Sequence, residues 1–283
     1  MINLELPKRL EDTRALLRQF SAGGLRPLSR KSDLLEQKER PQELYDLGKL
    51  LGGGRNRAAG GSEEPTAGAN RNGNNMFMVL SSAELCWGDV GLFLALPNVG
   101  LGNAAVSAVA TDEQKEEWGE LFASMAITEP GAGSDSAAIR TTAVLDGDEW
   151  VINGEKIFVT SGYRSKQVVV WASLDLKLGK AAIKSFLVPK GTPGMTVTRV
   201  EHKLGIRASD TAQIVFENCR VPKANLLGNP EIAKTAEDRK KAFGGVMQTF
   251  DNTRPMVAAQ GLGVARAALD LTLELLREKG IEL

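Results

Sequence analysis

The pattern of apolar and polar positions predicts helices over the first third of the chain. Residues 7–20 carry apolar side chains at a spacing typical of an amphipathic helix, and residues 41–51 fit a second, short one. Residues 76–110 are densely apolar with Gly and Pro interruptions, which predicts two buried helices. Thr111, followed by acidic residues, predicts an N-cap and a short helix through residue 121.

The pattern changes near residue 123 to short apolar runs separated by Gly, Pro, Asn and Asp, which are typical of strands and turns. Asn153-Gly154 is expected to form a tight turn. Many short strands at close spacing predict an antiparallel sheet or barrel. The expected strands are 141–145, 150–152, 155–160, 167–172, 185–188, 195–199 and 213–216.

Helical periodicity returns at residue 232, and residues 257–276 are apolar on most faces of a helix. Such a helix needs other helices to bury it, so we expect the start of a bundle with an exposed apolar face and a tendency to associate. The predicted fold class is α+β: an N-terminal α-helical domain (1–120), a middle antiparallel β-barrel domain (121–230) and a partial C-terminal helical domain (231–283). The Gly-rich stretch 52–75 is expected to be a loop, either a connector or a binding loop.

Composition excludes several classes of partner and of catalytic site. The chain has 283 residues with 35 basic and 35 acidic side chains, so neither a nucleic-acid nor an anionic-membrane partner is expected. Its single histidine, His202, argues against Ser-His-Asp hydrolysis and multi-histidine metal sites, so no metal is expected. Two cysteines and the lack of a signal-like or membrane-spanning stretch favour a soluble, cytoplasmic protein.

Residues 126–138, AITEPGAGSDSAA, lie where helices give way to strands. Glycines and short hydroxyl side chains allow backbone N–H groups to approach an anion, although a plain turn is the better explanation of Gly131 and Gly133 taken alone. The whole motif resembles the first signature of the acyl-CoA dehydrogenase family. Further stretches resemble that family in order and spacing: 151–162, 203–211, 216–222, 225–228, 250–255 and 261–263.

The resemblance implies FAD and an acyl-CoA substrate. The residues that it places at the flavin are Met125, Ile127, Thr128, Gly133, Ser134, Phe158, Val159 and Thr160. Phe158 would pack on the flavin ring and Thr160 would bond near flavin N5, whereas a core aromatic and an ordinary strand threonine are the alternatives. The implied substrate contacts are Ser134, Asp251 and Arg254, although Arg254 could instead form an internal salt bridge.

The implied reaction is α,β-dehydrogenation of the thioester to a trans-2-enoyl-CoA, with hydride transfer to FAD and reoxidation by an electron-transfer flavoprotein. Some relatives carry the catalytic glutamate at the position of Thr253, and most carry it later than residue 283, so the base is expected outside this segment. A homo- or hetero-oligomer, with a tetramer favoured, is implied. The alternatives are a non-catalytic or partner-dependent flavin- or acyl-CoA-binding subunit, and an acyl-CoA oxidase.

Overall fold

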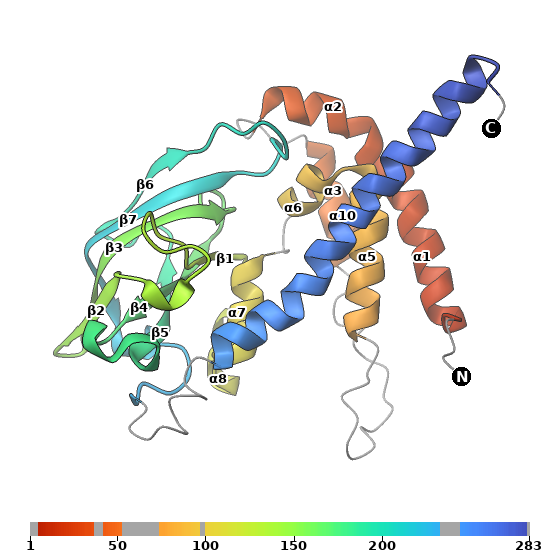
Figure 1. Ribbon diagram of the computed structural model, residues 1–283. Helices are drawn as coiled ribbons and strands as arrows, with labels where there is room; N and C mark the ends of the chain where they lie inside the picture. Colours follow the sequence, from red (N-terminus) through yellow and green to blue (C-terminus); the bar gives the residue numbers. More distant parts are fainter. Residues whose placement is uncertain (1–4, 37–41, 53–73, 97–99, 233–243, 282–283) are drawn as a thin grey trace. The chain divides into compact units, whose positions relative to one another are not determined.

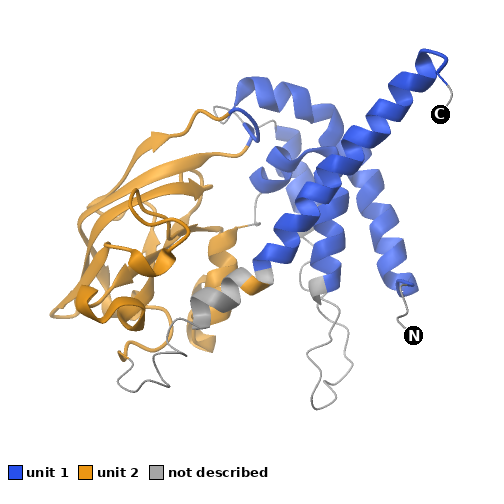
Figure 2. Ribbon diagram, viewed as in Figure 1, with its two compact units in different colours: residues 1–97, 204–208, 252–283 blue, residues 98–203, 209–251 orange. Residues whose placement is uncertain are grey.

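The computed structural model describes residues 5–36, 42–52, 74–96, 100–232 and 244–281 (Figure 1). The chain divides into two compact units (Figure 2). Unit 1 comprises residues 1–97, 204–208 and 252–283, and unit 2 comprises 98–203 and 209–251. Most of the loop expected at 52–75 lies outside the described residues. Within the described ranges, every helix is too short or too polar to cross a membrane.

Unit 1 is built from helices. They are α1 (Lys8–Phe20), the π-helical turn η1 (Ser21–Leu25), α2 (Arg26–Leu35), α3 (Gln42–Gly52), α5 (Asn74–Gly88), α6 (Val90–Ala95) and most of α10 (Gly244–Glu278). The helices expected at 7–20 and 41–51 are confirmed as α1 and α3. The sequence pattern missed η1 and α2, because Gly23, Gly24 and Pro27 look like breakers. Pro27 lies in the first turn of α2, where a missing N–H breaks no helical bond.

The two helices expected over 76–110 are in fact three: α5, α6 and α7 (Leu101–Val109), the last in unit 2. Asp89 causes the first break, because its carboxylate accepts a hydrogen bond of 2.6 Å from the backbone N–H of Leu92 and caps α6. The expected short helix after Thr111 is confirmed as α8 (Asp112–Trp118), with a capping box between Thr111 and Gln114.

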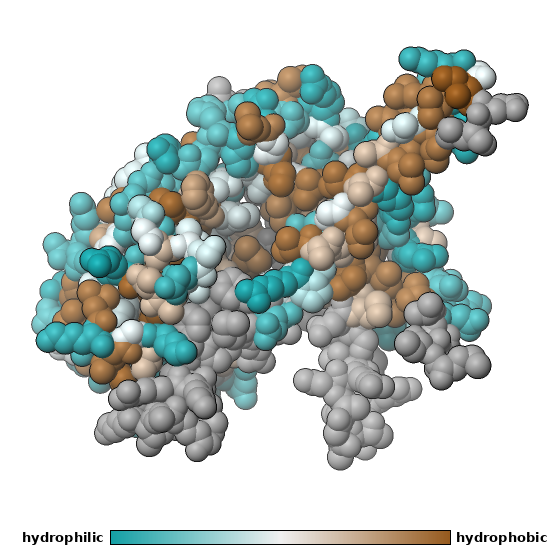
Figure 3. Space-filling model, in the orientation of Figure 1, coloured by the Kyte–Doolittle hydropathy of each residue, from teal (hydrophilic) through white to brown (hydrophobic). Residues whose placement is uncertain are grey.

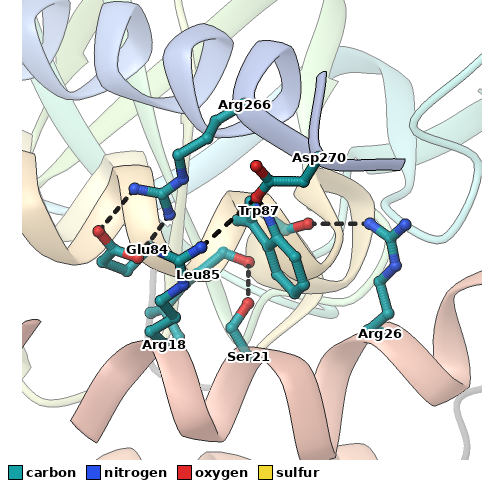
Figure 4. Close-up of polar contacts among 8 residues, drawn as sticks. All are labelled: Arg18, Ser21, Arg26, Glu84, Leu85, Trp87, Arg266 and Asp270. Carbon is teal, nitrogen blue, oxygen red and sulfur yellow. Dashed lines mark hydrogen bonds and ion pairs between the residues drawn. The ribbon is translucent and has the colours of Figure 1, made fainter. Parts of the chain in front are cut away.

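Side-chain contacts hold α10 against the other helices of unit 1 (Figure 4). Arg266 of α10 donates two hydrogen bonds, of 2.8 and 2.5 Å, to the buried carboxylate of Glu84 on α5. One turn later, Asp270 accepts a 2.8 Å bond from the indole N–H of Trp87. Gly263 permits this approach, because a Cβ there would lie 2.4 Å from the carbonyl oxygen of Ala83. Gly263, the second glycine of the Gly-Leu-Gly pattern at 261–263, therefore has a packing role in unit 1.

We expect Arg266→Met to destabilise unit 1, because it leaves the Glu84 carboxylate buried without its ionic partner. The expected loss in free energy of unfolding is about 1–3 kcal/mol, measured by urea unfolding followed by circular dichroism at 222 nm. Arg18→Met is the matched control, because Arg18 of α1 pairs with Asp270 of α10, and these side chains are 51% and 37% exposed. It should lose less than about 1 kcal/mol. Equal losses would contradict the role given to Glu84.

The expected exposed apolar face of α10 is confirmed and is visible as hydrophobic surface along that helix (Figure 3). Leu262 is 67% exposed, and Val257 and Leu269 are each 57% exposed. Val264, Leu271 and Leu275 extend this face.

Unit 2 contains α7, α8 and a curled, mixed, seven-stranded sheet. Its strands are β1 (Ala123–Ala126), β2 (Thr142–Asp146), β3 (Glu149–Thr160), β4 (Gln167–Ser173), β5 (Ile183–Pro189), β6 (Met195–Val200) and β7 (Thr211–Pro222), with short 3-10 turns η2 (Ser136–Ala138), η3 (Leu176–Ala182) and η4 (Lys223–Asn225). The order is β1-β4-β2-β3-β7-β6, and β5 also pairs with β4. The α+β class is confirmed, but the sheet is not wholly antiparallel, because β4 runs parallel to β1 and β2.

The hydrophobic core of unit 2 lies on both faces of β4, every residue of which is buried. Val168, Val170 and Ala172 pack on one side, and Val169 and Trp171 pack on the other. This explains the unbroken apolar run QVVVWA, since a strand covered on both faces needs no polar alternation.

The tight turn expected at Asn153-Gly154 is wrong: β3 runs through both residues without a break. Gly154 has φ of +151°, and a Cβ there would lie 2.4 Å from the hydroxyl of Thr141. The glycine is therefore explained by the close approach of Thr141.

Candidate functional site

The structure joins two segments of unit 2 that the sequence analysis assigned to one cofactor. The 125–134 segment contains the end of β1 and the turn after it, and the 158–160 segment is the end of β3. The backbone N–H of Ile157 donates a 2.9 Å hydrogen bond to the carbonyl of Thr128. Residues about thirty positions apart in sequence therefore lie side by side.

Phe158 occupies a bulge in β3. The pairing of β3 with β7 shifts between Lys156 and Val159, so that β3 has one residue more than its partner there. Phe158 takes a φ of +56° and is 61% exposed, whereas the adjacent Val159 is 1% exposed. A left-handed backbone is unfavourable for a bulky residue, and bulges near functional sites redirect side chains. The core alternative for Phe158 does not fit this exposure, so its ring is available to pack on a planar ligand.

Gly131 and Gly133 lie in the turn of the 125–134 segment, and the fold itself does not require either glycine. A Cβ at Gly131 would meet nothing within 4 Å, and one at Gly133 would meet only a methyl group of Thr128 at 3.9 Å. Neither residue is among those with positive φ. The absence of a side chain at these positions is not required by packing within the chain, but it allows a ligand to approach the backbone closely. This observation fits a bound FAD.

Behind the two segments, Glu129 and Lys156 form a buried ion pair. The Lys156 ammonium, 0% exposed, donates hydrogen bonds of 2.7 Å to Glu129 Oε1 and 3.1 Å to the carbonyl of Ile127. The Glu129 carboxylate also accepts bonds from the backbone N–H groups of Arg140 (2.6 Å) and Thr141 (2.9 Å), and from the Thr141 hydroxyl (2.6 Å). The pair thus connects the turn, β3 and the start of β2.

Both groups of the pair are charged near neutral pH. Burial opposes ionisation of Glu129, but the charge of Lys156 and the hydrogen bonds from Lys156, Thr141 and Arg140 lower the pKa of this carboxyl below its ordinary 4.5. Burial lowers the pKa of the Lys156 ammonium, and the charge of Glu129 limits that decrease. The interior behind the two segments therefore holds one negative and one positive charge.

The lowered pKa of Glu129 predicts an acid-sensitive contribution to stability. Its contribution is fully present above the ordinary carboxyl pKa of 4.5 and is lost as pH falls through the lowered value, because the unfolded chain binds the proton first. We expect Glu129→Gln to lack this loss, so that its stability declines less steeply than that of the wild type below pH 4.5. Urea unfolding at stepped pH measures the difference, and parallel acid limbs would contradict it.

Asp210 fixes the chain immediately after the 158–160 segment. It is 0% exposed. Its carboxylate accepts a 2.8 Å hydrogen bond from the backbone N–H of Tyr163 and forms an ion pair with Arg164. Its backbone carbonyl accepts a bond from Ser161, which has a φ of +61°. The end of β3 is therefore held on both sides, by Glu129–Lys156 before Phe158 and by Asp210 after Thr160.

A small cavity of about 270 Å³ lies beside the ion pair. It is lined by Glu129, Pro130, Gly131, Ala138, Arg140, Thr141, Gly154 and Glu155. Two of these side chains are carboxylates, and the volume is slightly below the range for organic ligands. We therefore assign no ligand to it.

The predicted cofactor residues lie on these two segments. Ile127 and Val159 are buried, Met125, Thr128 and Thr160 are half-buried, and Gly133, Ser134 and Phe158 are exposed. The predicted substrate residues Asp251 and Arg254 are exposed on α10, and Thr253 between them is 6% exposed. The structure thus brings the cofactor set together within unit 2, and the roles of all these residues remain predictions.

The role of Lys156 was not expected from the sequence. A signal was present, because Trp150, Ile152 and Lys156 share one parity along β3 and all three are buried. A lysine at an inward position of a strand needs a carboxylate partner.

Comparison with known proteins identifies relatives of the chain. The family profile for the acyl-CoA dehydrogenase middle domain matches residues 124–219. A probable acyl-CoA dehydrogenase, YngJ of Bacillus subtilis, is 34% identical over 98% of this chain and 71% of its own length. The bovine mitochondrial short-chain specific acyl-CoA dehydrogenase is 45% identical over 56% of this chain, and the match spans only 38% of that relative. The solved butyryl-CoA dehydrogenase of Megasphaera elsdenii matches with a TM-score of 0.79 and 30% identity, over 96% of this chain and 70% of that one.

Proposed function

Because this chain belongs to the acyl-CoA dehydrogenase family, we propose that it binds FAD on unit 2 and serves α,β-dehydrogenation of a short-chain acyl-CoA thioester. The members of this family are flavoproteins. The observation that carries the proposal is the joined surface of the 125–134 and 158–160 segments, with its open glycines and its exposed Phe158. The short-chain substrate class is supported by the bovine and Megasphaera relatives.

FAD, when bound, supplies the hydride acceptor. Ile127, Thr128, Gly133 and Ser134 would hold it through backbone and hydroxyl groups, Phe158 would pack on its ring system, and the Thr160 hydroxyl would donate a hydrogen bond near the reacting end. Ser134, Asp251 and Arg254 are the proposed acyl-CoA contacts, with the guanidinium suited to a phosphate or carbonyl oxygen.

No described residue is proposed as the base that removes the α proton. Thr253 has a hydroxyl, which is not a base at neutral pH, and Asp251 lies two positions earlier on α10. We propose that the base comes from outside residues 1–283, that the product is a trans-2-enoyl-CoA, and that an electron-transfer flavoprotein reoxidises the flavin within an oligomer.

The test uses the 283-residue chain reconstituted with FAD under anaerobic conditions. We expect retained flavin absorbance between about 350 and 500 nm, and a change in that spectrum when butyryl-CoA is added. Octanoyl-CoA and free CoA are the comparison ligands. Failure to retain FAD would contradict the cofactor assignment, and retention without any response to acyl-CoA would contradict the substrate assignment. Rapid reoxidation in air after chemical reduction would favour an oxidase over a dehydrogenase.

A further inference from the structure

The Glu129–Lys156 pair makes more contacts with the proposed flavin surface than stability alone explains. A buried ion pair is a weak source of stability, and apolar side chains of similar volume often serve as well. An apolar pair, however, could not satisfy the groups that this one satisfies. Those groups are the carbonyl of Ile127, the N–H groups of Arg140 and Thr141, and the Thr141 hydroxyl.

These contacts fix the two segments from behind. Glu129 lies within the 125–134 segment. Its backbone N–H and carbonyl form hydrogen bonds of 2.9 and 3.1 Å with the carbonyl and N–H of Ala132, which close the turn that contains Gly131 and directly precedes Gly133. Lys156 lies two residues before Phe158, at the start of the bulge. A movement of either charged group would therefore shift the turn relative to Phe158.

The approach of Thr141 to Gly154 completes the arrangement. The Thr141 hydroxyl reaches Glu129 only because Gly154 has no Cβ in its way. Gly154 therefore packs against a residue that is hydrogen-bonded to the ion pair.

We propose that Glu129 and Lys156 are positioning residues for the flavin: they hold the 125–134 segment in register with the 158–160 segment and keep the interior behind them electrically neutral. This inference rests on the proposed function, since it assumes that the surface binds FAD. It predicts that removing either charge shifts the midpoint potential of the bound flavin, which a pair with a purely structural role would not do.

The test measures two quantities in Glu129→Gln, Lys156→Met and the double variant. They are the Kd for FAD and the midpoint potential of the bound flavin, and the potential is measured at saturating FAD. We expect each single variant to raise the Kd at least about tenfold. The potentials should move in opposite directions. The potentials are measured at about pH 6, because loss of the Glu129 charge lowers the pKa of Lys156 below about 8. With Lys156 protonated, Glu129→Gln leaves a positive charge that stabilises the electron-rich reduced flavin, and Lys156→Met leaves a negative charge that destabilises it. The double variant should return toward the wild-type potential.

Two further variants keep the test decisive. Arg220→Met is the matched control, because Arg220 pairs with Asp146 and Glu149 on the exposed side of the same sheet, and it should change neither quantity. Thr141→Val removes a donor to Glu129 without changing charge, so it should raise the Kd and leave the potential unchanged. If Lys156→Met does not fold, Thr141→Val still tests the effect on the Kd, and Glu129→Gln tests the effect on the potential.

A folded Glu129→Gln variant with the Kd and potential of the wild type would overturn the inference. So would shifts in potential of the same sign in both single variants. If the wild type itself does not bind FAD, the proposed function fails instead, and the two failures are distinguishable.

Discussion

Lys156→Met is expected to lower the free energy of unfolding by about 3–5 kcal/mol, because it leaves the Glu129 carboxylate buried without its partner. Glu129 is 7% exposed, and its remaining donors are the N–H groups of Arg140 and Thr141 and the Thr141 hydroxyl. These bonds stabilise the carboxylate but do not neutralise it. Urea unfolding at pH 7, followed by circular dichroism, measures the loss.

The double variant Glu129→Gln, Lys156→Met separates the two contributions. It removes both charges, so we expect it to recover part of the stability lost in Lys156→Met. Arg220→Met, which breaks an exposed ion pair of the same sheet, should leave the unfolding transition close to that of the wild type. A Lys156→Met variant as stable as this control would show that Glu129 takes up a proton or reaches water at little cost. A buried, charged Glu129 would then not be the cause of the expected loss of stability.

The sequence pattern predicts those parts of the fold that depend on local periodicity. Helices α1, α3 and α8 and the strands β4 and β5 follow from residue spacing and capping, and they are confirmed. The mixed sheet could not be predicted in this way, because the parallel pairing of β1 with β4 joins Ala123 to Gln167 across two intervening strands. Such a pairing is determined by tertiary packing and leaves no local signal.

The error at Gly154 has a different origin. Asn-Gly between two apolar runs is typical of a hairpin turn, and nothing in the local pattern shows that Thr141 will lie against this glycine. Likewise, Glu129 belongs to the motif that carries the family resemblance, but its partner lies twenty-seven residues away. The sequence therefore indicates which segments form the candidate site, whereas the contacts that hold them together are visible only in the structure.

Gly133→Val tests whether the bare backbone of the 125–134 segment is needed by the ligand or by the fold. The structure has room for the added side chain, since the nearest atom to a Cβ at Gly133 is a methyl carbon of Thr128 at 3.9 Å. The apoprotein should therefore keep its wild-type Tm. The isopropyl group would nevertheless project from the exposed surface at which we propose that FAD approaches the backbone. We expect the Kd for FAD to rise about a hundredfold, a loss of about 2.7 kcal/mol of binding free energy.

Fluorescence titration of the apoprotein with FAD measures this change, and Gly133→Ala should give a smaller one because it adds a single methyl group. Gly23→Val is the matched control: Gly23 lies in the π-helical turn of unit 1, and a Cβ there meets nothing within 4 Å. It should bind FAD as the wild type does. If Gly133→Val lowers the Tm of the apoprotein, the glycine serves the fold. If it changes neither Tm nor Kd, the turn does not contact the cofactor, and the flavin site must then be sought away from the 125–134 segment.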